Sequence, residues 1–158
     1  MKIAIVSGGF DPIHGGHIEL MKRAKKLADH LVVILNSDEF LEVKKGKPFM
    51  PYEDRLAVIE SLRFVDMVVP SIDKDQTVKE TLRKLSECRT ILSKDIPYET
   101  LIFCNGGDRT SAENTAEHAV CEQLGIETVY GLGEKIQSSS SLISNSKKKR
   151  RTSKKKKK

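Results

Sequence analysis

The chain has 158 residues, of which 38% are hydrophobic, and this supports one compact domain rather than two. Its net charge of +6 is concentrated at one end, because ten of the 28 basic residues lie in residues 147–158, which contain no acidic residue. Residues 1–146 carry 18 basic and 22 acidic side chains, a net charge of −4. The body of the chain is therefore mildly acidic, and composition does not indicate a domain dedicated to nucleic-acid binding.

The three cysteines are Cys88, Cys104 and Cys121, too few and too irregularly spaced for a disulfide framework. No pair of them has the short spacing of a zinc site, so we expect no protein-bound metal centre and a reducing compartment. The opening segment MKIAIV is too short for a signal peptide, and no apolar stretch approaches the length of a membrane span. These features predict a cytoplasmic protein.

The first elements form a strand, a glycine turn, a helix and a second strand. Residues Lys2 to Ser7 are a largely aliphatic run typical of a buried parallel strand, and Gly8 and Gly9 end it. From His17 the apolar residues recur at helical spacing, which predicts an amphipathic helix. Leu31 to Leu35 is a second buried strand, so the segment reads as a βαβ unit with a right-handed crossover.

The polar stretch from Asn36 to Pro51 contains lysines, a glycine and prolines, and we expect a mobile loop there. Helices and strands then alternate to the end of the body. The expected helices cover Tyr52–Leu62, Thr77–Ser86 and Asn114–Leu124, and the expected strands cover Met67–Val69, Thr100–Cys104 and Glu127–Tyr130. This alternation predicts a single α/β domain, with an open parallel five-stranded sheet covered by helices on both faces.

The C-terminal part changes composition. Ser138 to Ser141 precede two apolar residues and favour a helix start. Residues 146–158 lack apolar side chains, so we expect a domain over residues 1–145 and a disordered basic tail over residues 146–158. The tail has no aromatic residue for base stacking, which leaves nonspecific contact with nucleic acid or an anionic surface, or a merely solubilising role.

The segment from Gly8 to His17, GGFDPIHGGH, lies between the first strand and its helix. In an open α/β sheet this is the carboxyl end of a strand, where ligands bind. Glycines there let the backbone approach phosphate oxygens, and the helix that follows presents N–H groups to the same anion. His14 and His17 are three residues apart and can point their imidazoles into one small volume. Two imidazole donors suit the charge that develops on a phosphoryl group under attack.

This segment resembles the HxGH signature of a nucleotidyltransferase superfamily that includes the glycerol-3-phosphate cytidylyltransferases and the heptose-phosphate adenylyltransferases. Further matching segments follow in the same order over roughly residues 1–145. They are Asn36-Ser37-Asp38-Glu39, Tyr52-Glu53-Asp54-Arg55, Arg63-Phe64-Val65-Asp66, Gly106-Gly107-Asp108 and Ser139-Ser140-Ser141. The resemblance implies a Rossmann-like domain of the cytidylyltransferase-like branch.

The resemblance also implies roles for individual residues. The catalytic residues would be His14, His17, Lys44 and Arg63, with Lys47 as a further phosphate contact. The nucleotide-binding residues would be Gly8, Gly9, Phe10, Asp11, Gly16, Gly107, Asp108, Ser139 and Ser140. Gly9 departs from the family pattern, in which many relatives carry a hydroxyl residue.

Some of these residues have a second interpretation from the sequence alone. The lysines from Lys44 to Lys47 fit a solvated loop as well as phosphate contact, and the serines fit a linker or a helix cap. Asp11 fits either a cap of the turn or coordination of magnesium through water.

The implied reaction is transfer of CMP from CTP to a small phosphorylated acceptor, a polyol, sugar or amino-alcohol phosphate, with release of pyrophosphate and help from Mg²⁺. An adenylyltransferase that uses ATP on a sugar phosphate is the alternative within the superfamily. A basic-tailed module that binds nucleic acid or nucleotide without turnover is an alternative of another class. The resemblance also implies a homodimer.

Overall fold

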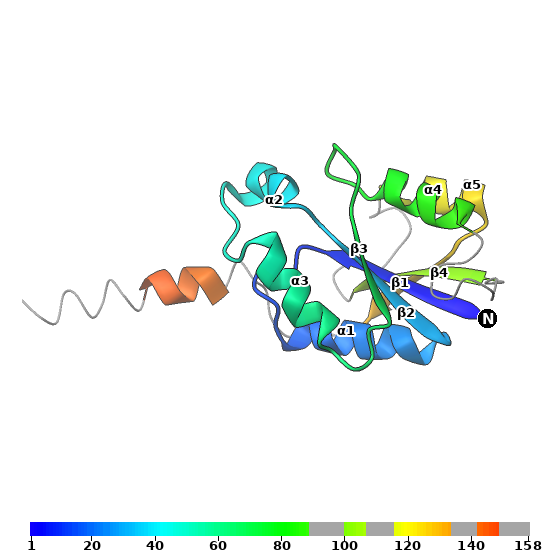
Figure 1. Ribbon diagram of the computed structural model, residues 1–158, viewed down its shortest axis with the longest axis horizontal. Helices are drawn as coiled ribbons and strands as arrows, with labels where there is room; N and C mark the ends of the chain where they lie inside the picture. Colours follow the sequence, from blue (N-terminus) through cyan, green and yellow to red (C-terminus); the bar gives the residue numbers. More distant parts are fainter. Residues whose placement is uncertain (89–99, 107–115, 134–141, 149–158) are drawn as a thin grey trace, which may run out of the picture.

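The computed structural model describes residues 1–88, 100–106, 116–133 and 142–148. Strands and helices alternate along these residues, except that two helices follow the second strand (Figure 1). The strands are β1 (Lys2–Gly8), β2 (His30–Leu35), β3 (Met67–Pro70), β4 (Thr100–Gly106) and β5 (Glu127–Leu132). The helices are α1 (Gly15–Lys26), α2 (Asp38–Lys45), α3 (Tyr52–Glu60), α4 (Lys79–Glu87) and α5 (His118–Leu124).

The five strands form one parallel sheet in the order β3-β2-β1-β4-β5. The chain builds outward from β1 through β2 to β3, then crosses back to add β4 and β5 on the other side of β1. The order of strands therefore reverses between β1 and β4, and ligands of open α/β sheets bind at the carboxyl ends of the strands flanking such a reversal. The predicted α/β architecture, with five parallel strands, is confirmed.

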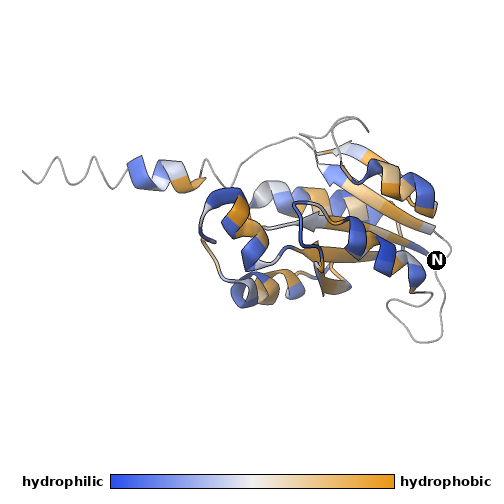
Figure 2. Ribbon diagram, turned by 90° about the horizontal axis from the view of Figure 1, so that it is seen from above, coloured by the Kyte–Doolittle hydropathy of each residue, from blue (hydrophilic) through white to orange (hydrophobic). Residues whose placement is uncertain are grey.

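Helices cover both faces of the sheet, with α1 and α3 on one side and α4 and α5 on the other (Figure 1). Successive residues of β1 point to opposite faces, so Ile3 and Ile5 pack with α4 and α5 while Ala4 and Val6 pack with α1 and α3. All four side chains are fully buried, which explains why the strand is aliphatic throughout. In Figure 2 the strands are mostly hydrophobic and lie between helices that carry hydrophilic residues.

The stretch predicted to be a mobile loop contains α2, and that prediction was wrong. Ser37 caps the helix by accepting a hydrogen bond from the Phe40 N–H at 3.1 Å, and Gly46, at φ 86°, ends it. Acidic residues occupy the first turn and lysines the last, as the helix dipole favours. Leu41 is buried. The lysines that suggested a loop are instead good helix formers at the end of a short helix.

A further helix covers residues 142–148 directly after the serine run, where the sequence predicts a helix start. It crosses the boundary expected at residue 145, and residues 149–158 of the predicted tail lie outside the described residues. In the ranges that the structure describes, none of the helices has the length and apolar character that a membrane span requires.

Candidate active site

The turn between β1 and α1 is held by hydrogen bonds between its two histidines and the backbone. His14 is the N-cap of α1, and its Nδ1 accepts from the Gly16 N–H at 3.1 Å. His17 returns the contact, because its Nδ1 accepts from the His14 N–H at 3.2 Å. This reciprocal capping box satisfies two N–H groups that a helix start otherwise leaves unpaired, and it fixes both rings.

The two imidazoles stack on each other. Their centroids are 3.7 Å apart and their planes differ by 24°. The Phe10 ring meets His17 edge-on, with centroids 4.9 Å apart and planes at 88°. The two histidines therefore share one small volume at the tip of β1, as the sequence predicts.

The protonation of the pair follows from the caps. Since Nδ1 of each ring accepts an N–H, the proton of the neutral ring sits on Nε2, which becomes a donor. Burial lowers the pKa of His14 from its ordinary value of 6.5. The first turn of α1 contains no acidic residue, so its positive dipole end is not neutralised locally. Neutral donors beside a helix N-terminus can bind an anion such as a phosphate group.

Close packing requires glycine at the end of β1. A Cβ on Gly8 would lie 2.9 Å from the Phe10 ring, and a Cβ on Gly9 would lie 2.6 Å from Cδ2 of Leu41. Phe10 itself has φ 51°, a left-handed conformation that costs a non-glycine residue free energy. The absence of a hydroxyl side chain at Gly9 thus coincides with α2 packing directly on the turn.

Asp11 anchors the loop that follows α2. Its side chain is buried, and its carboxylate accepts from the N–H groups of Phe49 at 2.7 Å and Met50 at 2.5 Å. Lys45 pairs with the same carboxylate at 2.9 Å and also donates to the Asp11 carbonyl at 2.6 Å. Both carboxylate oxygens are thus engaged within the protein. Among the described residues, no group of three or more His, Cys, Asp or Glu side chains could hold a metal ion.

The predicted lysines have different environments. Lys44 and Lys47 are exposed, one in the last turn of α2 and one just after it, on the segment that Asp11 anchors. Lys45 between them is engaged with Asp11. Gly8, Gly9, Phe10, Asp11 and Gly16 lie in or beside the turn between β1 and α1, which we name the histidine turn (residues 9–17). The predicted nucleotide contacts Gly107, Asp108, Ser139 and Ser140 lie outside the described residues.

Arg63 lies far from the histidine pair in the structure. It is exposed and follows α3, three residues before Asp66, whose backbone and side chain hydrogen-bond to Leu31 at the start of β2. Arg63 therefore lies toward the end of the sheet at which the parallel strands begin. The histidines lie at the other end of α1, whose twelve residues span roughly 18 Å. The structure thus separates Arg63 from the histidine pair within one chain.

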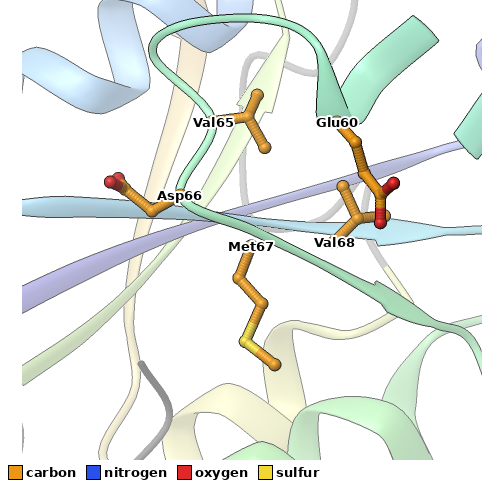
Figure 3. A pocket seen from close by; sticks show the side chains of 5 residues that line it. All are labelled: Glu60, Val65, Asp66, Met67 and Val68. Carbon is orange, nitrogen blue, oxygen red and sulfur yellow. The ribbon is translucent and has the colours of Figure 1, made fainter. Parts of the chain in front are cut away.

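A hollow also lies in this region, around the start of β3 (Figure 3). It is lined by Glu60, Val65, Asp66, Met67 and Val68. The Asp66 carboxylate accepts from the Leu31 N–H at 2.8 Å and pairs with Lys25 at 2.5 Å, so it joins the start of β3 to β2 and the end of α1. The hollow is separate from the histidine turn.

Sequence reasoning missed the role of Arg55. Its side chain is fully buried, donates to the carbonyls of Gly9, Asn36 and Met50, and pairs with Asp38. Its place in the Tyr-Glu-Asp-Arg segment at the start of α3 marks Arg55 as part of the family pattern. That position does not identify the residues to which its side chain binds.

Solved structures share the fold. A lipopolysaccharide core biosynthesis protein from Thermoplasma volcanium superposes with a TM-score of 0.63 at 23% identity, over 84% of this chain and 96% of that one. A bifunctional NMN adenylyltransferase/ADP ribose pyrophosphatase from Francisella tularensis gives 0.62 at 15% identity, over 89% of this chain and 40% of that one.

Relatives by sequence are more similar over shorter stretches. The glycerol-3-phosphate cytidylyltransferase of Staphylococcus aureus is 46% identical over 70 residues, 44% of this chain and 53% of the relative. That of Bacillus subtilis is 42% identical over 82 residues, 52% of this chain and 64% of the relative. The bifunctional protein HldE of Cronobacter sakazakii is 32% identical over 114 residues, 68% of this chain and 24% of the relative. The matches thus span about a quarter to just under two thirds of these relatives' own length.

The sequence model of the cytidylyltransferase-like family matches residues 5–146. This range runs from the second half of β1 to beyond β5 and includes the histidine turn, α2 and the segment with Arg55. The chain therefore belongs to the cytidylyltransferase-like family of nucleotidyltransferases.

Proposed function

We propose that this protein transfers CMP from CTP to a small phosphorylated acceptor, a polyol, sugar or amino-alcohol phosphate, and releases pyrophosphate. The observation that carries the proposal is the stacked pair of His14 and His17 at the carboxyl end of β1, with each Nδ1 held by a backbone N–H. Similarity to glycerol-3-phosphate cytidylyltransferases supports the choice of CTP and of this acceptor class.

The reaction is a single displacement. An oxygen of the acceptor phosphate attacks the α-phosphorus of CTP and forms a new P–O bond. The bond from that phosphorus to the oxygen bridging to the β-phosphate breaks, and its electron pair leaves with pyrophosphate. The acceptor oxygen is already anionic, so the protein supplies alignment and charge stabilisation rather than a nucleophile.

The histidines supply the charge stabilisation in this scheme. With Nδ1 of each ring engaged by a backbone N–H, Nε2 is the ring nitrogen that donates to the phosphate oxygens in this scheme, and the N-terminus of α1 adds its dipole. The rings are held before substrate arrives, so little reorganisation is required as charge develops. Lys44 and Lys47 neutralise the triphosphate, which their exposure beside the anchored loop supports. We assign no step to Arg63.

Further nucleotide contacts rest on the family resemblance. Gly107 and Asp108 follow β4 in the sequence and are proposed to contact the base and ribose. Strand β4 is the neighbour of β1 across the reversal in strand order. Ser139 and Ser140, shortly before the helix over residues 142–148, are proposed to contact phosphate oxygens. Mg²⁺ is proposed to arrive bound to the triphosphate, because the Asp11 carboxylate is engaged in the protein.

The second candidate is an adenylyltransferase that uses ATP. An FAD synthase of Pyrococcus horikoshii is 49% identical over 70 residues, and HldE also matches this chain. Because these relatives are not named as cytidylyltransferases, the similarity also supports a nucleotide other than CTP.

Pyrophosphate release measured with CTP, ATP, GTP and UTP against a panel of polyol, sugar and amino-alcohol phosphates tests the proposal. We expect release with CTP that depends on one acceptor class. Release with ATP alone would favour the adenylyltransferase, and no release with any pair would contradict both candidates. A homodimer, also proposed from the resemblance, is tested by sedimentation equilibrium on the same preparation.

A further inference from the structure

Arg55 binds three separate segments at the carboxyl ends of the strands. Its Nε donates to the Met50 carbonyl at 3.0 Å, and one terminal nitrogen donates to the carbonyls of Gly9 at 2.9 Å and Asn36 at 2.7 Å. The other terminal nitrogen pairs with Asp38 at 2.7 Å. The side chain is 0% exposed, so water does not compete for these contacts.

The Met50 peptide is held from both sides. Its N–H donates to Asp11 in the turn that leads to the histidines, and its carbonyl accepts from Arg55 on α3. The Gly9 carbonyl, at the start of the same turn, accepts from the same guanidinium. Arg55 and Asp11 thereby connect the histidine turn to residues 44–51, which we name the lysine loop.

The geometry points to a role in catalysis for this connection. We infer that Arg55 is a positioning residue that fixes the lysine loop relative to the histidine turn, so that Lys44 and Lys47 meet the same triphosphate as His14 and His17. This inference rests on the proposed function. Burying a guanidinium is costly unless its donors are satisfied, and here three of its acceptors are backbone carbonyls and the fourth is a carboxylate.

The planar fork of arginine is required for these contacts. Lysine keeps the charge but replaces the rigid set of donors with a single ammonium, which cannot reach carbonyls from three directions at once. Arg55→Lys should therefore leave the charge in place while loosening the loop from the turn.

The first test compares Arg55→Lys with a control arginine, Arg83→Lys on α4, whose half-buried side chain pairs with Glu80 on the same helix. We expect kcat/KM for CTP in pyrophosphate release to fall at least about tenfold in Arg55→Lys, per folded molecule, and to stay unchanged in Arg83→Lys. A wild-type kcat/KM in Arg55→Lys would overturn the inference. Absence of activity in the wild-type protein would instead count against the proposed function.

A double-mutant cycle separates positioning from a general loss of stability. Lys44→Ala is made alone and in the Arg55→Lys protein. If Arg55 positions the loop, Lys44 is already misplaced in Arg55→Lys. The loss of kcat/KM for CTP caused by Lys44→Ala, on a logarithmic scale, should then be less than half as large in the Arg55→Lys protein as in the wild type. Equal effects in the two backgrounds would show that the two residues act independently, against the inference.

Hydrogen exchange tests the connection without relying on activity, and Asp38→Asn serves as a milder variant should Arg55→Lys fold poorly. Loss of the charged partner of Arg55 should speed amide exchange in both the lysine loop and the histidine turn, and leave α4 and α5 unchanged. Faster exchange confined to α2, with both segments protected as in the wild type, would contradict the connection.

Discussion

His14 both caps a helix and is proposed to contact phosphate, and the two tasks require the same protonation state. Its Nδ1 accepts the Gly16 N–H only when that nitrogen carries no proton. Burial lowers its pKa, which keeps the ring neutral at pH values where a free histidine begins to charge. Protonation at Nδ1 would break the cap and add a charge beside the positive end of α1.

The pH dependence of stability follows from this direction. Because the folded pKa lies below the unfolded value of 6.5, the unfolded chain takes up the proton first as pH falls. The contribution of His14 is complete above about pH 6.5 and declines as pH drops from there through the folded pKa. His14→Asn keeps a capping side chain without titration, so its Tm should fall less than that of the wild type between pH 7.5 and 5.5. Parallel Tm profiles for the two proteins would refute this.

Helix α2 connects the histidine turn to the lysines, and its packing on Gly9 fixes its position. The side chain of Leu41 is 2% exposed and occupies the space that a Cβ at Gly9 would need. Gly15 offers a matched comparison, because a Cβ there has nothing within 4 Å.

We expect Gly9→Ala to lower the free energy of unfolding by about 1–3 kcal/mol through overpacking. Gly15→Ala, in open space at the start of α1, should be neutral or mildly stabilising. Adding Leu41→Val should recover part of the Gly9→Ala loss, because the shorter side chain frees the space. Urea denaturation of the four proteins measures this, and equal losses at the two glycines would be inconsistent with the packing.

Of the two lysines at the end of α2, Lys45 pairs with Asp11, and Lys44 is proposed to contact the substrate. Lys45→Met leaves the Asp11 carboxylate, 1% exposed, without its ion pair, and should cost about 1–3 kcal/mol of stability. Lys44→Met should leave stability unchanged and raise KM for CTP about tenfold, the scale of one charge-assisted contact. Denaturant titration and steady-state kinetics on both variants decide the assignment. The reverse pattern would show that Lys45, not Lys44, serves the substrate.

At the scale of the whole molecule, the sheet and the histidine pair followed from the sequence because each leaves a local signal. The aliphatic run of β1 reflects burial on both faces, and the spacing of His14 and His17 is a property of one helix start. Helix α2 was missed because its short amphipathic pattern lies within a run of lysines and turn residues.

The rest of the site depends on contacts between distant segments. Arg55 binds the carbonyls of Gly9, Asn36 and Met50, and a backbone acceptor leaves no mark on residue type. Arg63 shows the same limit, since its place in an ordered set of motifs does not reveal that the segment before β3 lies beside the start of β2 and the end of α1. Only the folded chain distinguishes these two arginines.

The parallel sheet places the start of α1 at the reversal between β1 and β4, and the central claim is that the two histidines there stabilise the transition state for nucleotidyl transfer. The most direct measurement is the steady-state rate of pyrophosphate release from CTP and acceptor by His14→Ala, His17→Ala and the wild type. We predict that each substitution lowers kcat by about a hundredfold or more and changes KM for CTP far less. A His17→Ala protein that is correctly folded and retains wild-type kcat would contradict the claim.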